Sequence, residues 1–367
     1  MSEGQFPKIA VQIPAWNQAA DLVDCLNSLK EVQYSNLEVV VVNNGEDNTS
    51  EIVRRDFQWV TLIEEGVDLG FCRANNIGFR YCLKKNFDYI FLLNGDTKVF
   101  PDTISTLLQV MQSDPSIAIA GAKNILMENP YYTWGKYGEV KWSPMLVMTA
   151  GRFEPDSTQK QPPKDVDWVI CNGCMIRGKA LAEIGLFDED YFMADEDVDW
   201  CYRAKAKGYR TVYVDEAAIL HKGNSSTNLA NKKMVFSYGY FLGRNPFLFA
   251  KKYGKKHQIA KLYFNVCIGI ILRILYYLYV NTKNLIIDIY RSNRRIIGAY
   301  VRSIYPTLKS QKVFIRGVKD GIKGTISPEF IYVKIPQPPS PELKPVEVSL
   351  RTFKQGRKAK FLRWLGL

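Results

Sequence analysis

Short apolar runs alternate with amphipathic stretches along the first 122 residues. Runs of strand length that are rich in apolar residues lie at 8–13, 37–42, 59–63, 89–93 and 117–120. The stretches between them have helical spacing: Leu22, Leu26 and Leu29, for example, share one face of a helix expected over 18–30. Strands that alternate with helices form βαβ units, in which the strands pair in parallel. The pattern therefore predicts an α/β fold with a mostly parallel sheet flanked by helices.

The regular alternation stops after residue 122. Residues 125–165 contain aromatic, proline and glycine residues without a clear period, so we expect loops and a β excursion there. An apolar run then predicts a strand over 166–176, and helical spacing resumes over 197–207. A further strand over 210–214 leads to His221.

The strand expected at 89–93 ends in the acidic turn Asn94-Gly95-Asp96. Its continuous apolar character indicates burial on both faces, as in a parallel sheet covered by helices. In open α/β sheets, ligands bind at the carboxyl ends of the strands. An aspartate at that place can hold a hard divalent cation, which in turn binds phosphate groups. Asp96 is therefore a candidate cation ligand.

A second acidic cluster, Asp195-Glu196-Asp197-Val198-Asp199, begins the helix expected over 197–207. Acidic residues are common at a helix N-terminus, because they cap it and interact favourably with the helix dipole. Three aspartates and one glutamate in five positions exceed what capping requires, which favours a catalytic role. His221, one of two histidines, is either a cation or phosphate ligand or a hydrogen-bonded structural residue.

Basic residues are concentrated in the C-terminal part of the chain. Residues 231–367 hold 27 of the 49 Lys and Arg but 5 of the 37 Asp and Glu. We therefore predict a catalytic domain at 1–230, a basic amphipathic helical region that associates with a membrane at 231–305, and a proline-containing linker with a basic amphipathic tail at 306–367. Such a basic C-terminal helical appendage is expected to meet an anionic surface, either lipid headgroups or nucleic acid.

The apolar stretch at 262–291 favours lipid over nucleic acid. Arg273 lies in its middle, and a central arginine costs roughly 2.5–3.5 kcal/mol on insertion into a bilayer. Polar residues fall on one half of the helical wheel and aliphatic residues on the other. This pattern predicts a helix that lies in the membrane interface and does not span the membrane.

The seven cysteines are scattered, and their odd number without framework spacing is typical of a reducing compartment. Cys171 and Cys174 form a CxxC pattern, which suggests zinc or redox chemistry. No second pair follows, so the preferred interpretation is two cysteines of the core. The N-terminal segment has no pattern of a signal sequence. We therefore expect a cytoplasmic protein.

Several motifs follow one another between residues 8 and 225. They are Ile13-Pro14-Ala15-Trp16-Asn17, Asn43-Asn44-Gly45, Leu69-Gly70-Phe71-Cys72-Arg73-Ala74-Asn75-Asn76, Asn94-Gly95-Asp96, Asn172-Gly173-Cys174, Asp195-Glu196-Asp197-Val198-Asp199-Trp200 and His221. Together they resemble the inverting glycosyltransferases of family 2, in particular the branch that contains rhamnosyltransferases and related polysaccharide-assembly enzymes. Their order and spacing carry the resemblance, since each motif alone is weak. The resemblance implies the GT-A fold, with a mixed, mostly parallel sheet flanked by helices.

The resemblance implies a nucleotide-sugar site at the ends of the first strands. The residues implied to contact the donor are Pro14, Ala15, Asn17, Asn43, Arg73 and Asn94. Asn43 stands where the family more often has aspartate, which loosens the expected selectivity for uracil or thymine. Gly95 stands where rhamnosyltransferase-like members often have proline, which loosens the link to one donor sugar. Arg73 is equally well explained as a surface residue.

The resemblance also implies the groups that perform the reaction. Asp96 and His221 would bind Mg²⁺ or Mn²⁺, and this cation would offset the charge on the departing pyrophosphate. Asp197 would be the general base, which takes the proton of the acceptor hydroxyl on the face opposite the leaving nucleotide. Asp195, Glu196 and Trp200 would support the site or contact the acceptor.

The resulting hypothesis is an inverting, metal-dependent glycosyltransferase at the inner face of the cell membrane. It would move a sugar from a UDP- or dTDP-sugar, with dTDP-rhamnose as one candidate, to a hydroxyl of a glycan or lipid-linked acceptor in polysaccharide or glycolipid biosynthesis. Two other interpretations stay open. A sugar nucleotidyltransferase shares the α/β core and a metal-binding aspartate, but residues 14–18 are not its glycine-rich phosphate loop. An inactive scaffold with the same fold would not need both Asp96 and Asp197.

Overall fold

The computed structural model describes residues 6–65, 69–142, 147–157, 159–223, 232–269, 271 and 308–327. Three sequence predictions concern other parts of the chain. Most of the interfacial helix expected over 262–291, the proline-containing linker and the basic tail lie outside the described residues.

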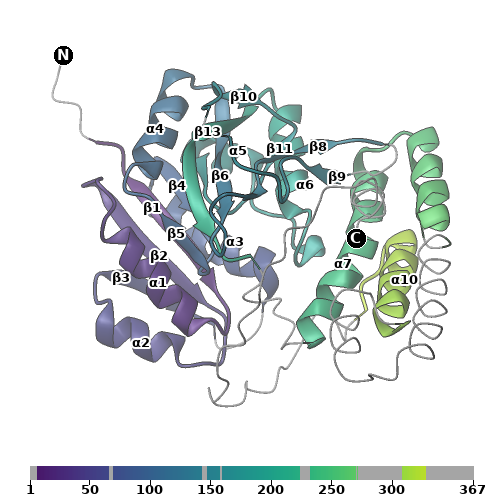
Figure 1. Ribbon diagram of the computed structural model, residues 1–367, viewed down its shortest axis with the longest axis horizontal. Coiled ribbons are helices and arrows are strands. Elements are labelled where there is room, and N and C mark those ends of the chain that lie inside the picture. The colour runs from purple at the N-terminus through teal and green to yellow at the C-terminus, as the bar shows by residue number, and fades with distance from the viewer. Residues whose placement is uncertain are drawn as a thin grey trace, which may run out of the picture.

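Most strands belong to one mixed sheet with the order β10-β13-β6-β12-β4-β1-β2-β3, in which β5 pairs with β13 and β7 with β6 (Figure 1). The strands of this sheet are β1 (Ile9–Ala15), β2 (Leu37–Asn43), β3 (Val60–Glu64), β4 (Tyr89–Leu92), β5 (Thr97–Val99), β6 (Ile117–Leu126), β7 (Thr133–Gly135), β10 (Lys164–Asp165), β12 (Cys174–Arg177) and β13 (Arg210–His221). β1 pairs in parallel with β2 and β4, whereas β12 runs antiparallel between β4 and β6. A smaller sheet consists of β11 (Trp168–Val169), β8 (Tyr137–Val140) and β9 (Val147–Thr149). The predicted α/β fold with a mixed, mostly parallel sheet is confirmed.

Helices cover both faces of the large sheet. They are α1 (Ala19–Leu29), α2 (Thr49–Asp56), α3 (Gly70–Lys84), α4 (Thr103–Ser113), α5 (Gly178–Ile184) and α6 (Glu196–Ala206). Leu26 of α1 and Leu107 of α4 belong to the apolar core on one face. Phe79 of α3 and Val198 of α6 belong to the core on the other face. Because both faces are covered, β1 and β4 are buried along their whole length, which explains their continuous apolar sequences.

The single strand predicted over 166–176 is wrong. The chain leaves the small sheet after β11 and enters the large sheet at β12, with a turn at 170–173 between them. Gly173 has a φ of +76°, a conformation that glycine adopts without strain, and its N–H donates to Leu92 O at 2.9 Å. The apolar run reflects burial of the whole segment, and burial alone does not reveal a change of sheet.

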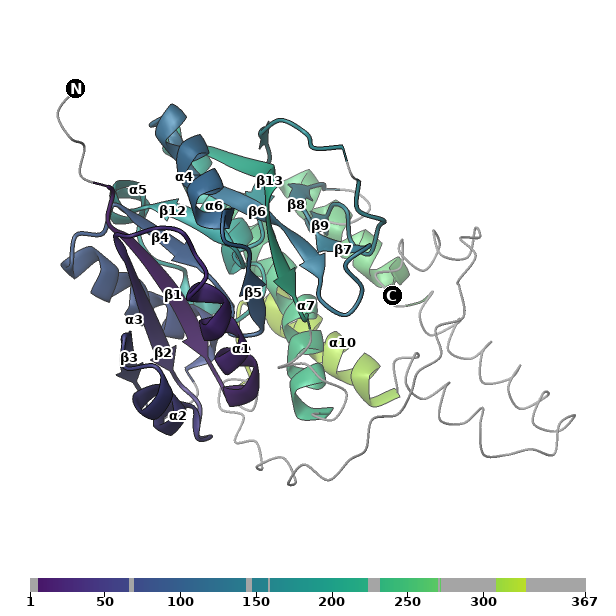
Figure 2. The same ribbon diagram turned by 60° about the vertical axis from the view of Figure 1, so that its left-hand side comes forward.

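The C-terminal part begins with α7 (Lys232–Tyr253), which packs against α10 (Leu308–Lys323) (Figures 1 and 2). The two helices approach closely at glycine positions. A Cβ atom on Gly317 would lie 2.0 Å from Tyr240 O, and one on Gly321 would lie 2.5 Å from Arg244 O. The Tyr240 hydroxyl donates to Asp320 Oδ2 at 2.7 Å, which fixes the register of the pair.

α7 also supports the loop that precedes α6. Asn245 Nδ2 donates to Met193 O at 2.8 Å and to Ala194 O at 2.7 Å, and the Arg244 guanidinium donates to Asp190 O at 2.7 Å. The region predicted at 231–305 therefore begins with a helix that is hydrogen-bonded to the segment before α6. Within the parts of the chain that the structure describes, no helix combines the length and apolar character needed to cross a membrane.

Candidate active site

The motifs at the strand ends lie along one edge of the large sheet. β1, β2 and β4 run in the same direction, so their carboxyl ends share this edge. β4 and β6 both pair antiparallel with β12, and β13 is parallel to β6, so the end of β13 at His221 lies there too. In Figures 1 and 2 the arrows of β1, β2 and β13 point towards this edge. The topology thus gathers residues that are far apart in the sequence.

Asp96 and His221, the two predicted cation ligands, approach each other at this edge. Asp96 Oδ1 lies 3.4 Å from His221 Nε2, and each side chain is 7% exposed. They come together because β5, which follows Asp96, pairs antiparallel with the end of β13, with Thr97 opposite His221. Among the described residues, none forms a hydrogen bond with the buried His221 Nδ1, and the centre of the imidazole ring lies 4.7 Å from that of Trp134. No local sequence signal indicates a role for Trp134 at this site.

The pair fits two of the ligands of a divalent cation. Neighbouring ligands of an octahedral ion, at bond lengths of about 2.1 Å, are roughly 3 Å apart. Asp96 Oδ1 and His221 Nε2 are close to that separation. Among the described residues, no group of three or more His, Cys, Asp and Glu side chains is arranged to hold a metal ion. An ion at Asp96 and His221 would therefore need further oxygen ligands, such as those of a diphosphate and water.

Asn172 holds the turn that carries Asp96. Its Oδ1 accepts hydrogen bonds from Asn94 N at 2.9 Å and from the Thr97 hydroxyl at 3.0 Å, so the turn is fixed on both sides of Asp96. Asn124 fixes Asn172 in turn, because its Nδ2 donates to Asn172 O at 3.0 Å. Both amide side chains are buried. Asn172 belongs to the motif Asn172-Gly173-Cys174, whose sequence does not reveal this role, and Asn124 has no local sequence signal.

The loop after β1 lies against the same turn. Pro14 and Ala15 are buried, and Gln18 Nε2 donates to Pro14 O at 3.5 Å. A Cβ atom on Gly95 would lie 2.5 Å from Gln18 Nε2. Glycine at position 95 therefore permits the close approach of the two loops. Pro14 and Ala15 shape this edge with backbone and apolar atoms, since neither has a polar side chain.

Asn17 and Asn43, two predicted donor contacts, both organise the loop after β2. Asn17 has a φ of +47°, and its Oδ1 accepts from the backbone N–H groups of residues 46 and 47 at 2.8 and 3.1 Å. Asn43 Oδ1 accepts from Gly45 N at 3.1 Å, and its Nδ2 donates to the Ser50 hydroxyl at 2.8 Å. Both side chains thus have local partners, and Asn43 is buried while Asn17 is exposed.

Arg73 is paired with an acidic residue of the segment before α6. Its Nε donates to Glu189 Oε2 at 2.8 Å, and Glu189 Oε1 also accepts from Asn76 Nδ2 at 3.1 Å. Glu189 begins the short 3₁₀ helix η1 (Glu189–Tyr191). This geometry gives Arg73 a role in joining α3 to η1, and it provides no contact with Asp96.

The acidic cluster surrounds the start of α6. Burial, together with the charge of Asp197, raises the pKa of Asp195 to about 7. Burial raises the pKa of Asp197 to about 6, although hydrogen bonds from the backbone N–H groups of Val198 and Cys171 lower it. Burial and the Asp197 charge hold the pKa of Glu196 well above its usual range. A carboxyl group with a pKa near the working pH is suited to accept a proton during a reaction.

Asp199 and Trp200 point into the protein. Asp199 is fully buried and accepts hydrogen bonds from Arg203 Nε and from the Tyr253 hydroxyl, each at 2.8 Å. Trp200 is also fully buried, and its Nε1 donates to Gly185 O at 2.8 Å. Trp200 therefore supports the position of α6, and the alternative of direct acceptor contact is wrong for this side chain.

Cys171 and Asn172 connect the two acidic motifs. The backbone N–H of Cys171 interacts with the Asp197 carboxylate and lowers its pKa, and the next residue, Asn172, binds the turn on both sides of Asp96. Consecutive Cα atoms are about 3.8 Å apart. Asp96 and Asp197, the candidate cation ligand and the candidate base, therefore border the same two-residue segment.

The CxxC pair belongs to the core. Cys171 and Cys174 are both buried, and neither forms a disulfide. A hydrogen bond to Cys174, together with burial, raises the pKa of the Cys171 thiol well above its usual range. A thiol with a high pKa stays protonated and unreactive. The interpretation as core cysteines is confirmed.

Comparison with known proteins agrees with this geometry. Residues 7–235 match the protein family described as "Glycosyltransferase like family 2". The dTDP-rhamnosyl transferase RfbF of Shigella flexneri is 26% identical over 232 residues, which are 62% of this chain and 75% of the relative. The N-acetylglucosaminyl-diphospho-decaprenol L-rhamnosyltransferase of Mycobacterium tuberculosis is 27% identical over 245 residues, which are 60% of this chain and 77% of the relative.

Solved structures share the fold. A mannosyltransferase of Pyrobaculum calidifontis, in complex with GDP-Man and Mn²⁺, superposes with a TM-score of 0.52 at 15% identity and covers 86% of this chain and 87% of its own. GalNAc-T7 with UDP, GalNAc and Mn²⁺ superposes with a TM-score of 0.50 at 17% identity, over 67% of this chain and 51% of its own. The chain therefore belongs to glycosyltransferase family 2, has the GT-A fold and is a glycosyltransferase.

Proposed function

We propose that this glycosyltransferase is inverting and metal-dependent, and that it transfers a sugar from a UDP- or dTDP-sugar to a hydroxyl of a glycan or lipid-linked acceptor in polysaccharide or glycolipid biosynthesis. One observation carries the proposal. Asp197, a half-buried carboxyl group with a pKa of about 6, borders the segment that also fixes the turn of Asp96. The names of the relatives, two of them rhamnosyltransferases, support dTDP-rhamnose as the first donor to test.

Asp197 acts as the general base in this proposal. The acceptor oxygen attacks the anomeric carbon while the bond to the diphosphate breaks, and the hydroxyl proton passes to the carboxylate. Because the pKa of Asp197 is about 6, the group is mostly ionised at pH 7 and still accepts a proton readily. The charge of Asp197 raises the pKa values of Asp195 and Glu196, so these two side chains form part of the electrostatic environment of the general base.

Asp96 and His221 would hold the divalent cation, Mg²⁺ or Mn²⁺, which when bound offsets negative charge on the departing diphosphate. Asn172 orients the turn of Asp96 through its bonds to Asn94 N and Thr97 Oγ1. The loops that contain Pro14, Ala15, Asn17 and Asn43 flank this turn and would contact the nucleotide. The Mn²⁺ in the solved structures of the mannosyltransferase and GalNAc-T7 supports the choice of cation.

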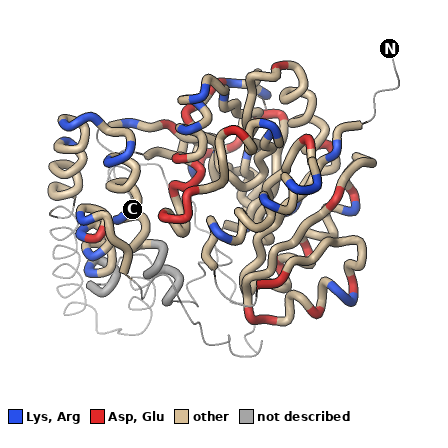
Figure 3. The backbone as a smooth tube through the Cα atoms, turned by 180° about the vertical axis from the view of Figure 1, so that it is seen from behind, with Lys and Arg blue, Asp and Glu red and all other residues tan. Residues whose placement is uncertain are grey.

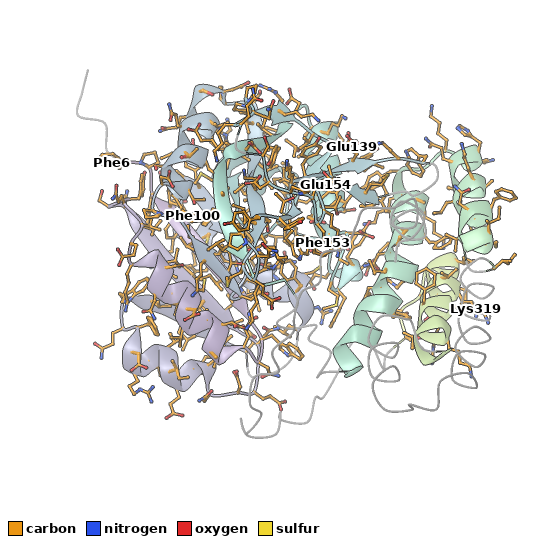
Figure 4. All side chains as sticks on the ribbon, viewed as in Figure 1. Phe6, Phe100, Glu139, Phe153, Glu154 and Lys319 are labelled. Atoms are coloured by element: carbon orange, nitrogen blue, oxygen red, sulfur yellow. The ribbon has the colours of Figure 1, made fainter. Side chains whose placement is uncertain are left out.

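The C-terminal helices would bring the enzyme to the inner face of the cell membrane. Lys312, Arg316, Lys319 and Lys323 are exposed on α10 at spacings of three and four residues, which places them on one side of the helix. Basic positions of α10 are blue in Figure 3, and Figure 4 labels Lys319. Phe264 and Ile271 are exposed on the segment that follows α7. Basic and apolar side chains together favour peripheral binding to anionic lipids.

The test is donor turnover by the purified full chain. A panel of UDP- and dTDP-sugars is incubated with Mn²⁺, and release of the nucleoside diphosphate is measured. Asp197→Asn should lower turnover about 100-fold or more, as expected for the loss of a general base. Asp102→Asn, which alters an exposed aspartate before α4, is the matched control and should leave turnover unchanged.

Three results would contradict the proposal. Full turnover in Asp197→Asn would exclude the general-base role. Donor turnover that is insensitive to EDTA would exclude the metal dependence. A wild-type protein that consumes no donor in the panel would favour an inactive scaffold.

A further inference from the structure

A series of neighbouring side chains leads from His221 to the protein surface. The Trp134 ring lies 4.7 Å from the His221 ring. The Arg152 guanidinium carbon lies 5.3 Å from the Trp134 ring centre and 5.3 Å from that of Phe153. Phe153 itself is 46% exposed. An exposed aromatic ring is therefore connected through two side chains to a residue of the candidate active site.

Phe153 stands at a backbone position where glycine is usual. Its N–H donates to Thr133 O at 2.8 Å, while Thr133 N donates to Glu154 O at 2.9 Å. Two residues thus oppose one, as in the β-bulge whose first residue is normally a left-handed glycine. Phe153 has a φ of +54°, which is strained for a bulky side chain. Since nearly half of the side chain is exposed, burial does not explain why phenylalanine occupies this position, and strain of this kind is typical of functional sites.

Further aromatic side chains come from the paired segment. Tyr131 is 82% exposed, and its carbonyl oxygen accepts from Asp156 N at 2.8 Å. Tyr132 forms a β-bridge with Pro155. These bonds hold residues 131–134 against 151–156, so that the exposed rings are carried on one supported structure. We call Tyr131, Tyr132, Arg152, Phe153 and Glu154 the aromatic platform; Figure 4 labels Phe153 and Glu154.

We propose that the aromatic platform binds a pyranose ring of the acceptor glycan. The proposal deepens the proposed function, on which it rests for the identity of the acceptor. One face of a hexose ring consists of C–H bonds, whose slight positive charge suits the negative face of an aromatic ring. The hydroxyl groups of the sugar need hydrogen-bond donors and acceptors, which the exposed sequence neighbours of Phe153, Arg152 and Glu154, can supply. The exposed carboxylate of Glu154 would repel an anionic lipid surface, which favours a sugar as the occupant.

The location agrees with an acceptor site. Trp134 links the aromatic platform to His221, which lies beside Asp96 at the turn where the donor diphosphate would bind. An acceptor sugar on the platform would therefore be connected to the donor site through Arg152 and Trp134. The ring that would contact the sugar is that of Phe153, because Phe153 is exposed whereas Trp134 is half-buried.

The experiment measures binding of simple glycosides to the full chain by saturation-transfer NMR. The probes are the methyl glycosides of glucose, galactose, mannose and N-acetylglucosamine. At least one of them should bind, and Phe153→Gly should weaken that binding about tenfold or more, whereas Phe153→Tyr should retain it within about threefold. Because glycine suits the left-handed backbone at this position, the thermal midpoint of Phe153→Gly should be unchanged or raised. Loss of binding then cannot be ascribed to misfolding.

Trp59→Ala is the matched control. Trp59 is 44% exposed, much like Phe153, but it precedes β3 and lies at the opposite, amino-terminal edge of the parallel strands. Its removal should leave glycoside binding unchanged.

The proposal is overturned if no glycoside binds the wild-type protein or if Phe153→Gly binds as the wild type does. It is also overturned if Phe153→Gly loses binding to phosphatidylglycerol vesicles while glycoside binding persists, since the platform would then serve a lipid. Mn²⁺-dependent donor hydrolysis without acceptor separates this result from the proposed function. If Phe153→Gly still hydrolyses the donor, the platform acts on the acceptor side. If the wild-type protein binds glycosides but hydrolyses no donor, the result counts against the proposed function and not against the platform.

Discussion

Replacement of Asp197 by asparagine should stabilise the protein at neutral pH while it stops catalysis. Burial raises the pKa of Asp197 from 3.8 to about 6, so the folded protein holds a charge at pH 7 that the unfolded chain holds more easily in water. Asparagine has nearly the same shape, and its side-chain oxygen can still accept the bonds from Val198 N and Cys171 N. Loss of the charge also removes repulsion from Asp195 and Glu196, whose pKa values Asp197 raises.

The magnitude follows from the pKa difference between the folded and unfolded states. A rise from 3.8 to about 6 corresponds to about 3 kcal/mol of unfolding free energy, because one pKa unit is worth about 1.4 kcal/mol. This is an upper value, since the half-buried side chain keeps part of its hydration. We expect a gain of about 1–3 kcal/mol, and each kcal/mol raises the melting temperature by about 1–2 °C in a protein of this size.

The gain should depend on pH. The folded state binds the Asp197 proton more tightly than the unfolded state does, so this group favours the folded wild-type protein below pH 3.8 and loses that effect as the pH rises through about 6. The advantage of Asp197→Asn should therefore be small near pH 4 and complete above pH 6. Wild-type kcat/KM should rise about tenfold per pH unit below about pH 6 and level off above it.

Thermal unfolding of the wild type, Asp197→Asn and the control Asp102→Asn between pH 4 and pH 8 tests this reasoning. The difference between the wild type and Asp197→Asn should grow with pH, while the control follows the wild type throughout. A destabilised Asp197→Asn at all pH values, or a constant difference across the range, would refute the claim that the folded site holds a disfavoured charge.

Three other perturbations test the remaining parts of the site. Asp96→Asn should weaken Mn²⁺ binding, measured by titration calorimetry, and lower donor turnover about 100-fold. Asn172→Ala should cost about 1–3 kcal/mol of stability and raise the Mn²⁺ concentration for half-maximal activity, because Asn94 N and the Thr97 hydroxyl lose their acceptor, whereas Asn172→Asp should restore part of the effect. Replacement of Lys312, Lys319 and Lys323 by glutamate should reduce flotation with anionic vesicles and leave turnover in solution unchanged.

Each of these has an opposing result. Unaltered Mn²⁺ binding in Asp96→Asn would show that this turn does not bind the cation. An Asn172→Ala protein that is less stable but keeps its Mn²⁺ requirement would give Asn172 a purely structural role. If the protein with the three charge reversals still floats with anionic vesicles, α10 does not contact the membrane.

The sequence by itself determined the order of elements from β1 to α4, with the exception of the short strand β5, and the two acidic motifs. These features are local: strands buried on both faces must be continuously apolar, amphipathic helices repeat at helical spacing, and a turn after a strand needs glycine and short polar residues. The positions of Asp96 and Asp197 within such motifs could therefore be predicted from the sequence.

Only the tertiary structure decided how the polar groups pair. The break between β11 and β12, the Asn124–Asn172 pair, the burial of Trp200 and the bonds from α7 to the loop before α6 have no local signature. Each arises because a buried donor or acceptor must find a partner, and that partner can come from any distance along the chain. The left-handed backbone of Phe153 could not be predicted from the sequence either, because its hydrogen bonds to the distant residue Thr133 impose it.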